Sequence, residues 1–222
     1  DYLFASRKMT LPSFIATIVT TWYGGILEIG RFSYENGIVT WIIFGFYYYI
    51  AAIIYGIYIG PKLYSNNINS IPEYFKKYYG ETIGKFTSII VIFISSPAPY
   101  IMILSTLLIH IFNIDIHLSI ILSILFSTIY LYFGGFRSII RTDKIQFIFM
   151  FLGFILMLIY LYDSFGGINF LINNVPDNNL SFTGKLPLGY ILSWSLISMI
   201  TFIDPSIFQR VYSSKNHSII KN

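Results

Sequence analysis

The stretch IVTWIIFGFYYYIAAIIYGIYI (residues 38–59) contains no charged side chain. A helix needs about 20 consecutive apolar residues to cross the hydrocarbon core of a bilayer, and this stretch is long enough. Transmembrane β-strands are only about 10 residues long and alternate apolar with polar side chains, a pattern that this stretch lacks. The stretch therefore predicts a transmembrane helix and indicates that the chain is an all-α membrane protein.

The composition of the whole chain agrees with this interpretation. Of its 222 residues 55% are hydrophobic and only 11% are charged, and its mean hydropathy is +0.69. A typical soluble domain carries about 25% charged residues, so a soluble or disordered protein is excluded. The chain has no cysteine, which also excludes disulfide frameworks, thiolate metal sites and cysteine nucleophiles.

Working outward from residues 38–59, five further apolar stretches are long enough for helices. The sequence predicts one transmembrane domain with spans at about residues 11–30, 38–59, 86–111, 118–136, 145–162 and 186–208. The inner loops are expected at 60–85, 137–144 and 209–222. The first span is the weakest because Glu28 lies inside it. In the loop 60–85, Ser70-Ile71-Pro72-Glu73 predicts the start of a short helix with Ser70 as its N-cap.

The basic residues predict how the chain crosses the membrane. Cytoplasmic loops are enriched in Lys and Arg. With the N-terminus inside, every Lys and Arg except Arg31 and Lys185 falls on the inner side. We therefore expect a multi-pass protein of the plasma (inner) membrane with both ends of this sequence in the cytoplasm. The lipid bilayer is its expected partner, with no nucleic acid. The polar ends suggest a piece of a longer protein.

Two of the predicted spans contain helix-breaking residues. The first contains TTWYGG (residues 20–25), where a glycine pair follows β-branched residues, and the sixth contains Pro205, which removes a helical hydrogen bond. Interrupted spans at corresponding positions of two halves point to the binding site of a secondary transporter, where unwound carbonyl groups can coordinate sodium. The alternative is that Gly24 and Gly25 only allow close packing of helices.

Several motifs occur in an order and spacing that resemble the sodium:solute symporter family, which includes proline, sugar, pantothenate and sialic acid symporters. These motifs are DYLFASR (1–7), TWYGG (21–25), SIPE (70–73), Gly134-Gly135 with Thr142-Asp143 and Gln146, and Pro205 with Gln209-Arg210 and Lys215. The resemblance implies an inverted-repeat fold of five plus five core helices, similar to the leucine transporter. This sequence would hold core helices one to six, without core helix eight, whose hydroxyl groups complete the family's sodium site.

The resemblance also implies residues for a sodium site. The family binds sodium with two backbone carbonyl groups of its broken first helix, and these correspond to Thr20 and Tyr23, with Thr21 as the neighbouring alternative. A tight kink that binds no ion is the other interpretation. Asp143 corresponds to an acid near the inner sodium exit, or in a second sodium site. Its position is also compatible with a helix cap.

A substrate cavity beside the break is expected to include Thr21, Trp22, Gly24, Glu28, Tyr48, Tyr100 and Trp194. Glu28 is unusual because a carboxylate inside a span is costly and is often functional. An ion pair with Arg31, three residues later on the same helix face, is the structural alternative. Asp204, the other acid near membrane depth, would face an inner vestibule or pair with a basic residue.

These features favour sodium-coupled symport of a small organic solute by alternating access. A transporter-like sensor that does not transport and a sodium-independent carrier are the alternatives. An intramembrane enzyme is disfavoured because His110, His117 and His217 are the chain's three histidines and form no metal-binding pattern. A channel is disfavoured because no selectivity-filter loop or charged ring is apparent.

Overall fold

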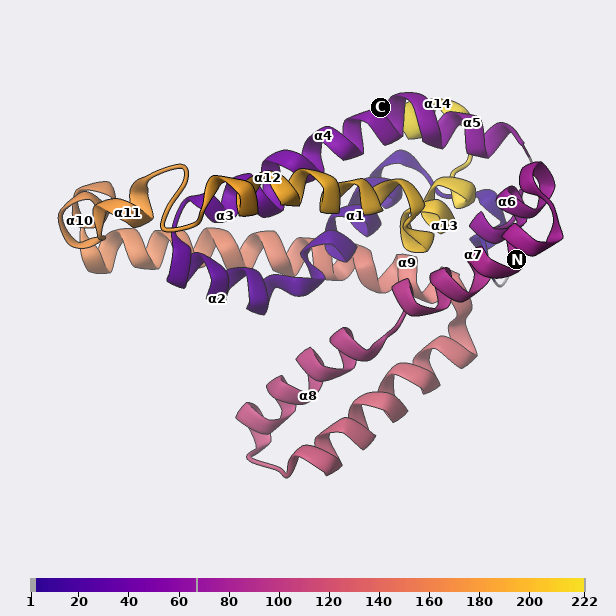
Figure 1. The fold of residues 1–222 in the computed structure, drawn as a ribbon. Helices are drawn as coiled ribbons and strands as arrows, with labels where there is room; N and C mark the ends of the chain where they lie inside the picture. The colour runs from indigo at the N-terminus through magenta and orange to yellow at the C-terminus, as the bar shows by residue number, and fades with distance from the viewer. Residues whose placement is uncertain (1–2, 67, 222) are drawn as a thin grey trace. The chain divides into compact units, whose positions relative to one another are not determined.

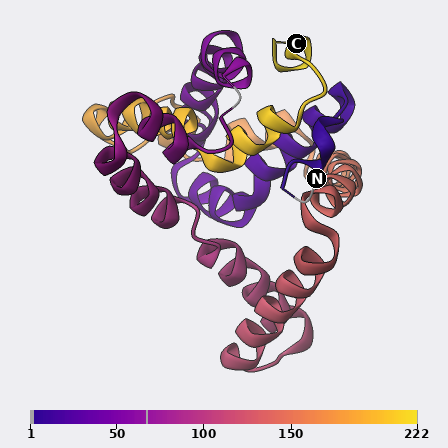
Figure 2. The same ribbon diagram turned by 90° about the vertical axis from the view of Figure 1, so that its right-hand side faces the viewer.

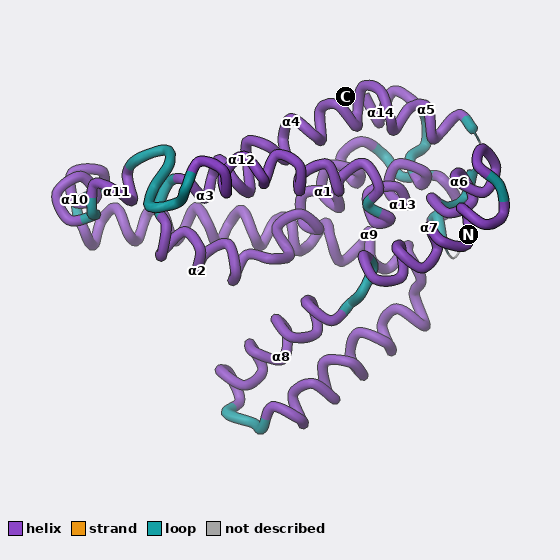
Figure 3. The backbone as a smooth tube through the Cα atoms, viewed as in Figure 1, coloured by secondary structure: helices purple, strands orange, loops and turns teal. Residues whose placement is uncertain are grey.

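The computed structural model describes residues 3–66 and 68–221. Asp1 and Tyr2, which belong to the first family motif, lie outside the described residues. Within the described ranges the chain is all-α, as predicted, and Figure 3 shows helices and loops without a strand. An isolated β-bridge joins Met9 to Ser214.

Several helices in the described part of the chain are long and apolar enough to cross a membrane. They are Val39–Ser65, Glu81–Phe112 and Leu131–Phe165, and the pair Leu188–Ile203 and Pro205–Ser213, bent by 43°, could form a fourth span. The fold is thus that of a polytopic membrane protein. The arrangement of six spans remains a prediction.

The chain divides into two compact units. The first unit consists of Asp1–Gly25, Gly56–Lys144 and Ile203–Asn222. Its α-helices, labelled in Figure 1, are α1 (Leu11–Trp22), α5 (Gly60–Ser65), α6 (Ile71–Tyr79), α7 (Glu81–Ile94), α8 (Ala98–Phe112), the first part of α9 (Ile116–Phe165), α13 (Pro205–Ser213) and α14 (His217–Lys221). It also contains the 3-10 turns η1 (Ala5–Arg7) and η2 (Tyr23–Gly25).

The second unit consists of Ile26–Tyr55 and Ile145–Phe202. Its elements are α2 (Ile26–Asn36), α3 (Val39–Trp41), the π-helix η3 (Ile42–Phe46), α4 (Tyr47–Ile54), the rest of α9, α10 (Ile168–Asn174), α11 (Asp177–Leu180), α12 (Leu188–Ile197) and most of η5 (Ser198–Ile203). A second π-helix, η4 (Tyr55–Ile59), connects the two units along the chain. Val39, Ile43 and Ile191 form the buried core of this unit, with Phe44 and Trp194 packed against it.

Capping residues begin two helices of the first unit. The Ser70 hydroxyl accepts a hydrogen bond from the backbone N–H of Glu73 at 3.3 Å, which confirms the predicted N-cap of α6. Asp204 caps α13 in the same way and accepts from the backbone N–H of Ser206 at 2.7 Å. Pro205 occupies the first position of α13, where its missing N–H costs nothing. The predicted interruption at Pro205 is therefore the start of a new helix.

Hydrogen bonds from the segment that precedes α1 hold α13 beside α1. The backbone N–H of Met9 donates to Ser213 at 3.1 Å, and the Gln209 side chain donates to the carbonyl of Leu3 at 2.8 Å. In both views α13 lies beside α1 (Figure 1 and Figure 2). Side chains of α13 can therefore reach the residues of α1.

The long helix α9 is kinked at Gly135, which has φ 54° and ψ −159°. This backbone conformation is essentially restricted to glycine because a β-carbon would clash with the backbone. After the kink, residues 137–144 continue as helix. The kink thereby sets the direction of the helical segment that carries Asp143.

We predict that Gly135→Ala lowers the free energy of unfolding by about 1–3 kcal/mol, because alanine would be strained at this φ and ψ. Thermal unfolding in detergent would measure the change. Gly153→Ala is the matched control, since Gly153 lies on α9 with no neighbouring atom within 4 Å of an added β-carbon. Equal melting temperatures for the two variants would contradict the assignment of strain to Gly135.

Candidate functional site

Helix α1 ends where the sequence predicts the break. Its α-helical part stops at Trp22 and is followed by the 3-10 turn Tyr23–Gly25. Just before the break, the Thr20 hydroxyl donates to the carbonyl of Ala16 at 2.9 Å, and the Thr21 hydroxyl donates to the carbonyl of Thr17 at 2.7 Å. Such bonds to the preceding turn often bend helices. The threonines and the glycines thus both favour a change of backbone geometry here.

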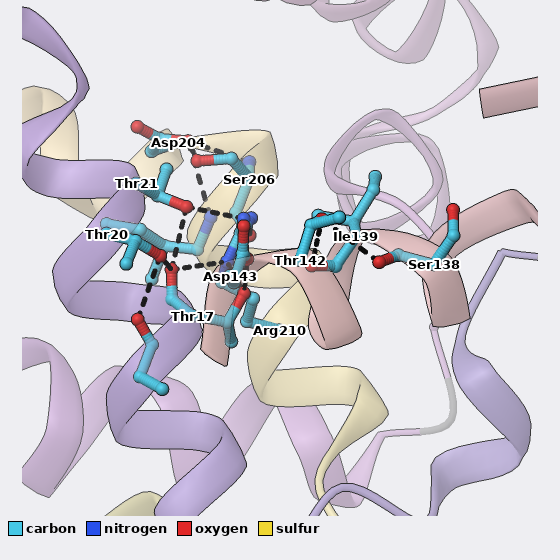
Figure 4. Close-up of polar contacts among 12 residues, drawn as sticks. Thr17, Thr20, Thr21, Ser138, Ile139, Thr142, Asp143, Asp204, Ser206 and Arg210 are labelled. Carbon is cyan, nitrogen blue, oxygen red and sulfur yellow. Dashed lines mark hydrogen bonds and ion pairs between the residues drawn. The ribbon is translucent and has the colours of Figure 1, made fainter. Parts of the chain in front are cut away.

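Asp143 reaches this part of α1 from α9. It is only 7% exposed, and its Oδ2 atom accepts a hydrogen bond from the hydroxyl of Thr17, which is fully buried. Figure 4 shows this contact, and also shows the neighbouring Thr142 turned back to carbonyl groups of its own helix. Because Asp143 lies inside α9 and not at a helix start, it does not cap a helix.

Arg210 enters the same cluster from α13. It is 5% exposed, and its Nη2 atom lies 3.5 Å from Asp143 Oδ2. Its Nε atom donates to both oxygens of Thr17, at 3.1 Å to the hydroxyl and 3.2 Å to the carbonyl. Its Nη2 atom also donates to the Thr21 hydroxyl, and its Nη1 atom donates to the carbonyl of Ser206 at 3.0 Å. The guanidinium group therefore ties α1, α9 and α13 together.

The energetics of this cluster depend on pairing. A buried charge that loses its partner destabilises a protein by about 3–5 kcal/mol, because the remaining charge stays out of water. The charges of Asp143 and Arg210 compensate each other, and the hydroxyl of Thr17 donates a further hydrogen bond to the carboxylate. The cluster is rich in carboxylate, hydroxyl and carbonyl oxygens, which are the ligands that hard cations prefer. In the part of the chain that the structure describes, no three His, Cys, Asp or Glu residues form a metal-binding group.

Tyr100 lies beside the break in α1. Helix α7 ends at Ile94 and α8 begins at Ala98, so Tyr100 lies in the first turn of α8. A β-carbon added to Gly24 would lie 2.9 Å from Cε1 of Tyr100, closer than side-chain atoms approach each other, whereas one added to Gly25 would have no neighbour within 4 Å. The two glycines of the pair therefore differ, and Gly24 makes room for the tyrosine ring.

Three residues of the predicted cavity belong to the second unit. Glu28 is exposed on α2, and its expected ion pair with Arg31 is replaced by one between Arg31 and Glu35, with N and O atoms 3.0 Å apart. The hydrogen bond and charge of Glu35 raise the pKa of Arg31, and the charge of Glu28 adds a smaller contribution. Trp194 packs edge-on against Phe44 with ring centroids 4.8 Å apart, and Tyr48 is half-buried.

The family resemblance implies that Asp143 lies near a sodium path, but the sequence does not identify its two partners. Thr17 lies one helical turn before Thr20 and Thr21 and so on the same face of α1. This spacing is the sequence signal that could have identified Thr17 as a site residue. Arg210 belongs to a motif that carried the family resemblance, yet sequence alone does not show that it is buried. Asp204 lies close enough to act electrostatically on Arg210, while its carboxylate caps α13.

Comparison with known proteins decides the family. The model of the sodium:solute symporter family matches residues 2–222 of this chain. The chain belongs to the sodium:solute symporter family. A search of curated proteins found no significant match. The family is one of multi-pass membrane transporters that couple solute transport to sodium, and it is not a family of enzymes.

We predict that Gly24→Ala reduces sodium-driven solute uptake by the full-length protein roughly fivefold, since overpacking against Tyr100 costs about 1 kcal/mol or more. Uptake into proteoliposomes would measure the loss. Gly25→Ala, whose added methyl group meets open space, is expected to keep the wild-type rate. The double variant with Tyr100→Ala is expected to recover part of the activity lost in Gly24→Ala. Equal uptake by the two alanine variants would refute the assigned role of Gly24.

Proposed function

We propose that this protein takes up a small organic solute together with sodium, by alternating access about a site at the break in α1. The observation that carries the proposal is the buried Asp143 carboxylate, bonded to Thr17 one turn before the break. The backbone carbonyl groups of Thr20 and Tyr23 flank the break and supply sodium ligands, with the hydroxyl of Thr21 nearby. Irregular backbone inside a membrane is tolerated where it lines such a site.

The charge of Asp143 gives the site its preference for cations. In the low dielectric of a membrane protein a carboxylate attracts a cation more strongly than it does in water. Asp143 therefore lies at the inner exit of sodium or belongs to a second sodium site. The membrane potential assists entry, because one elementary charge gains about 2.3 kcal/mol per 100 mV.

We place the solute cavity beside the same break. Thr21, Trp22, Gly24 and Tyr100 belong to α1, η2 and α8, and support for this assignment comes from the close approach of Tyr100 to Gly24. Glu28, Tyr48 and Trp194, which belong to the second unit, remain candidates for the lining on the sequence alone. We place the protein in the plasma membrane with both ends of this sequence in the cytoplasm, because its basic residues then fall mostly on the cytoplasmic side.

The test is uptake by proteoliposomes that contain the full-length protein, with a panel of labelled sugars, amino acids, vitamins and organic acids. An inward sodium gradient is expected to drive accumulation of one solute class. Asp143→Asn is expected to abolish the sodium dependence, because the amide carries no charge. Asp163→Asn removes an exposed carboxylate from the same helix and is expected to leave uptake unchanged.

Thermal unfolding with and without sodium accompanies this assay, since Asp143→Asn also deprives Arg210 of its charge partner. If sodium stabilises the wild type but no solute accumulates, the protein is a sodium-binding sensor. If solute accumulates without a sodium gradient, it is a sodium-independent carrier. If Asp143→Asn retains normal sodium-driven uptake, the proposed site is wrong.

A further inference from the structure

The guanidinium group of Arg210 lies among oxygen atoms of three helices. Its contacts within hydrogen-bond distance are the hydroxyl and carbonyl of Thr17, the hydroxyl of Thr21, the carbonyl of Ser206 and Oδ2 of Asp143. These are the carboxylate, hydroxyl and backbone carbonyl oxygens that a hard cation takes as ligands. The side chain of Arg210 thus lies among oxygen atoms of the kinds that also bind cations (Figure 4).

The single negative charge among these oxygen partners of Arg210 can compensate one monovalent cation. Asp143 supplies one negative charge, and Thr17 and Thr21 contribute neutral oxygens. Two positive charges beside one buried carboxylate would leave one of them uncompensated, which is strongly unfavourable. A sodium ion and the guanidinium group of Arg210 therefore compete for the Asp143 carboxylate, and when sodium is bound there Arg210 depends on the charge of Asp204 instead.

We propose that Arg210 competes with the coupling sodium ion for Asp143 and Thr17, and that this competition promotes the release of sodium toward the inner side. This inference rests on the proposed sodium-coupled function. Arg210 approaches the carboxylate as sodium leaves, so that Asp143 is never left unpaired. Because it acts through the charge of Asp143, Arg210 is a positioning residue and not a ligand of the solute.

The geometry of the pair suits such an exchange. The Arg210–Asp143 contact uses one nitrogen and one oxygen at 3.5 Å, longer than the bonds from Arg210 to Thr17 and Ser206. A strong arginine–carboxylate pair is shorter and usually has two parallel bonds. Arg210 can therefore give up the carboxylate while it keeps its bond to Ser206 on α13. The charge of Asp204 acts on Arg210 from the start of the same helix, and stabilises the displaced guanidinium group.

A purely structural role makes the opposite prediction. If Arg210 only holds α1 to α13, its loss would loosen the arrangement of these oxygen atoms and weaken sodium binding. If it competes with sodium, its loss strengthens sodium binding, because the uncompensated Asp143 then has sodium as its available partner. The sign of the change in sodium affinity separates the two roles.

The experiment compares full-length wild type, Arg210→Gln, Arg210→Lys and Arg141→Gln. The apparent affinity for sodium is measured from the rise in melting temperature with sodium concentration. We expect Arg210→Gln to melt at a lower temperature without sodium, and to bind sodium roughly fivefold or more tightly, a factor typical of coupled sites. Arg141→Gln removes an exposed positive charge two residues from Asp143, and is expected to match the wild type.

Transport gives a second readout for the same variants. With slower release of sodium, Arg210→Gln is expected to lose net uptake while it retains most of its solute exchange at equal sodium concentrations on both sides. Arg210→Lys keeps the buried charge with three donors in place of five. It is expected to fold like the wild type and to have a sodium affinity between those of the wild type and Arg210→Gln.

The outcomes separate this inference from the proposed function. Absence of any sodium effect in the wild type means that the proposed function is wrong. Normal sodium coupling in the wild type, together with unchanged or weaker sodium binding in Arg210→Gln, overturns only the competition. If Arg210→Gln does not fold, Arg210→Lys decides, since wild-type sodium affinity in that variant would equally overturn the inference.

Discussion

The buried carboxylate of Asp143 is the constraint on which the rest of the first unit depends. An ionised group this far from water persists only when it is paired and hydrogen-bonded, and here Arg210 and Thr17 supply both. The need to satisfy one charge thus brings together α1, α9 and α13, which are distant in the sequence. Removing either charged partner would destabilise the unit as a whole, because the other charge would remain buried.

The break in α1 lies beside this charge, and the two features support each other. Thr20 and Thr21 turn their hydroxyl groups toward the preceding helical turn, and Gly24 leaves space for the ring of Tyr100. Irregular backbone inside a membrane is tolerated where it is buried in protein or lines a polar site. The proposed sodium site and the proposed competition by Arg210 both follow from this combination of irregular backbone and one negative charge.

Local sequence signals predicted the features that depend on neighbouring residues. The all-α class follows from long charge-free runs, the start of α6 from Ser70, and the end of α1 from the glycine pair at 24 and 25. Each of these depends on the hydrophobicity, backbone propensity or capping of one continuous stretch of sequence. Arg31, the possible ion-pair partner of Glu28, instead forms its ion pair with Glu35 on the same helix.

The sequence by itself determined that this chain is a helical membrane protein of the symporter family and where its first helix breaks, and it indicated Asp143 as a candidate site residue. It could do so because hydrophobicity, helix propensity and motif order are properties of short stretches. Only the tertiary structure decided that Thr17 and Arg210 are the partners of Asp143. These residues are separated from it by 126 and 67 positions, and burial and charge pairing depend on which helices come together in space.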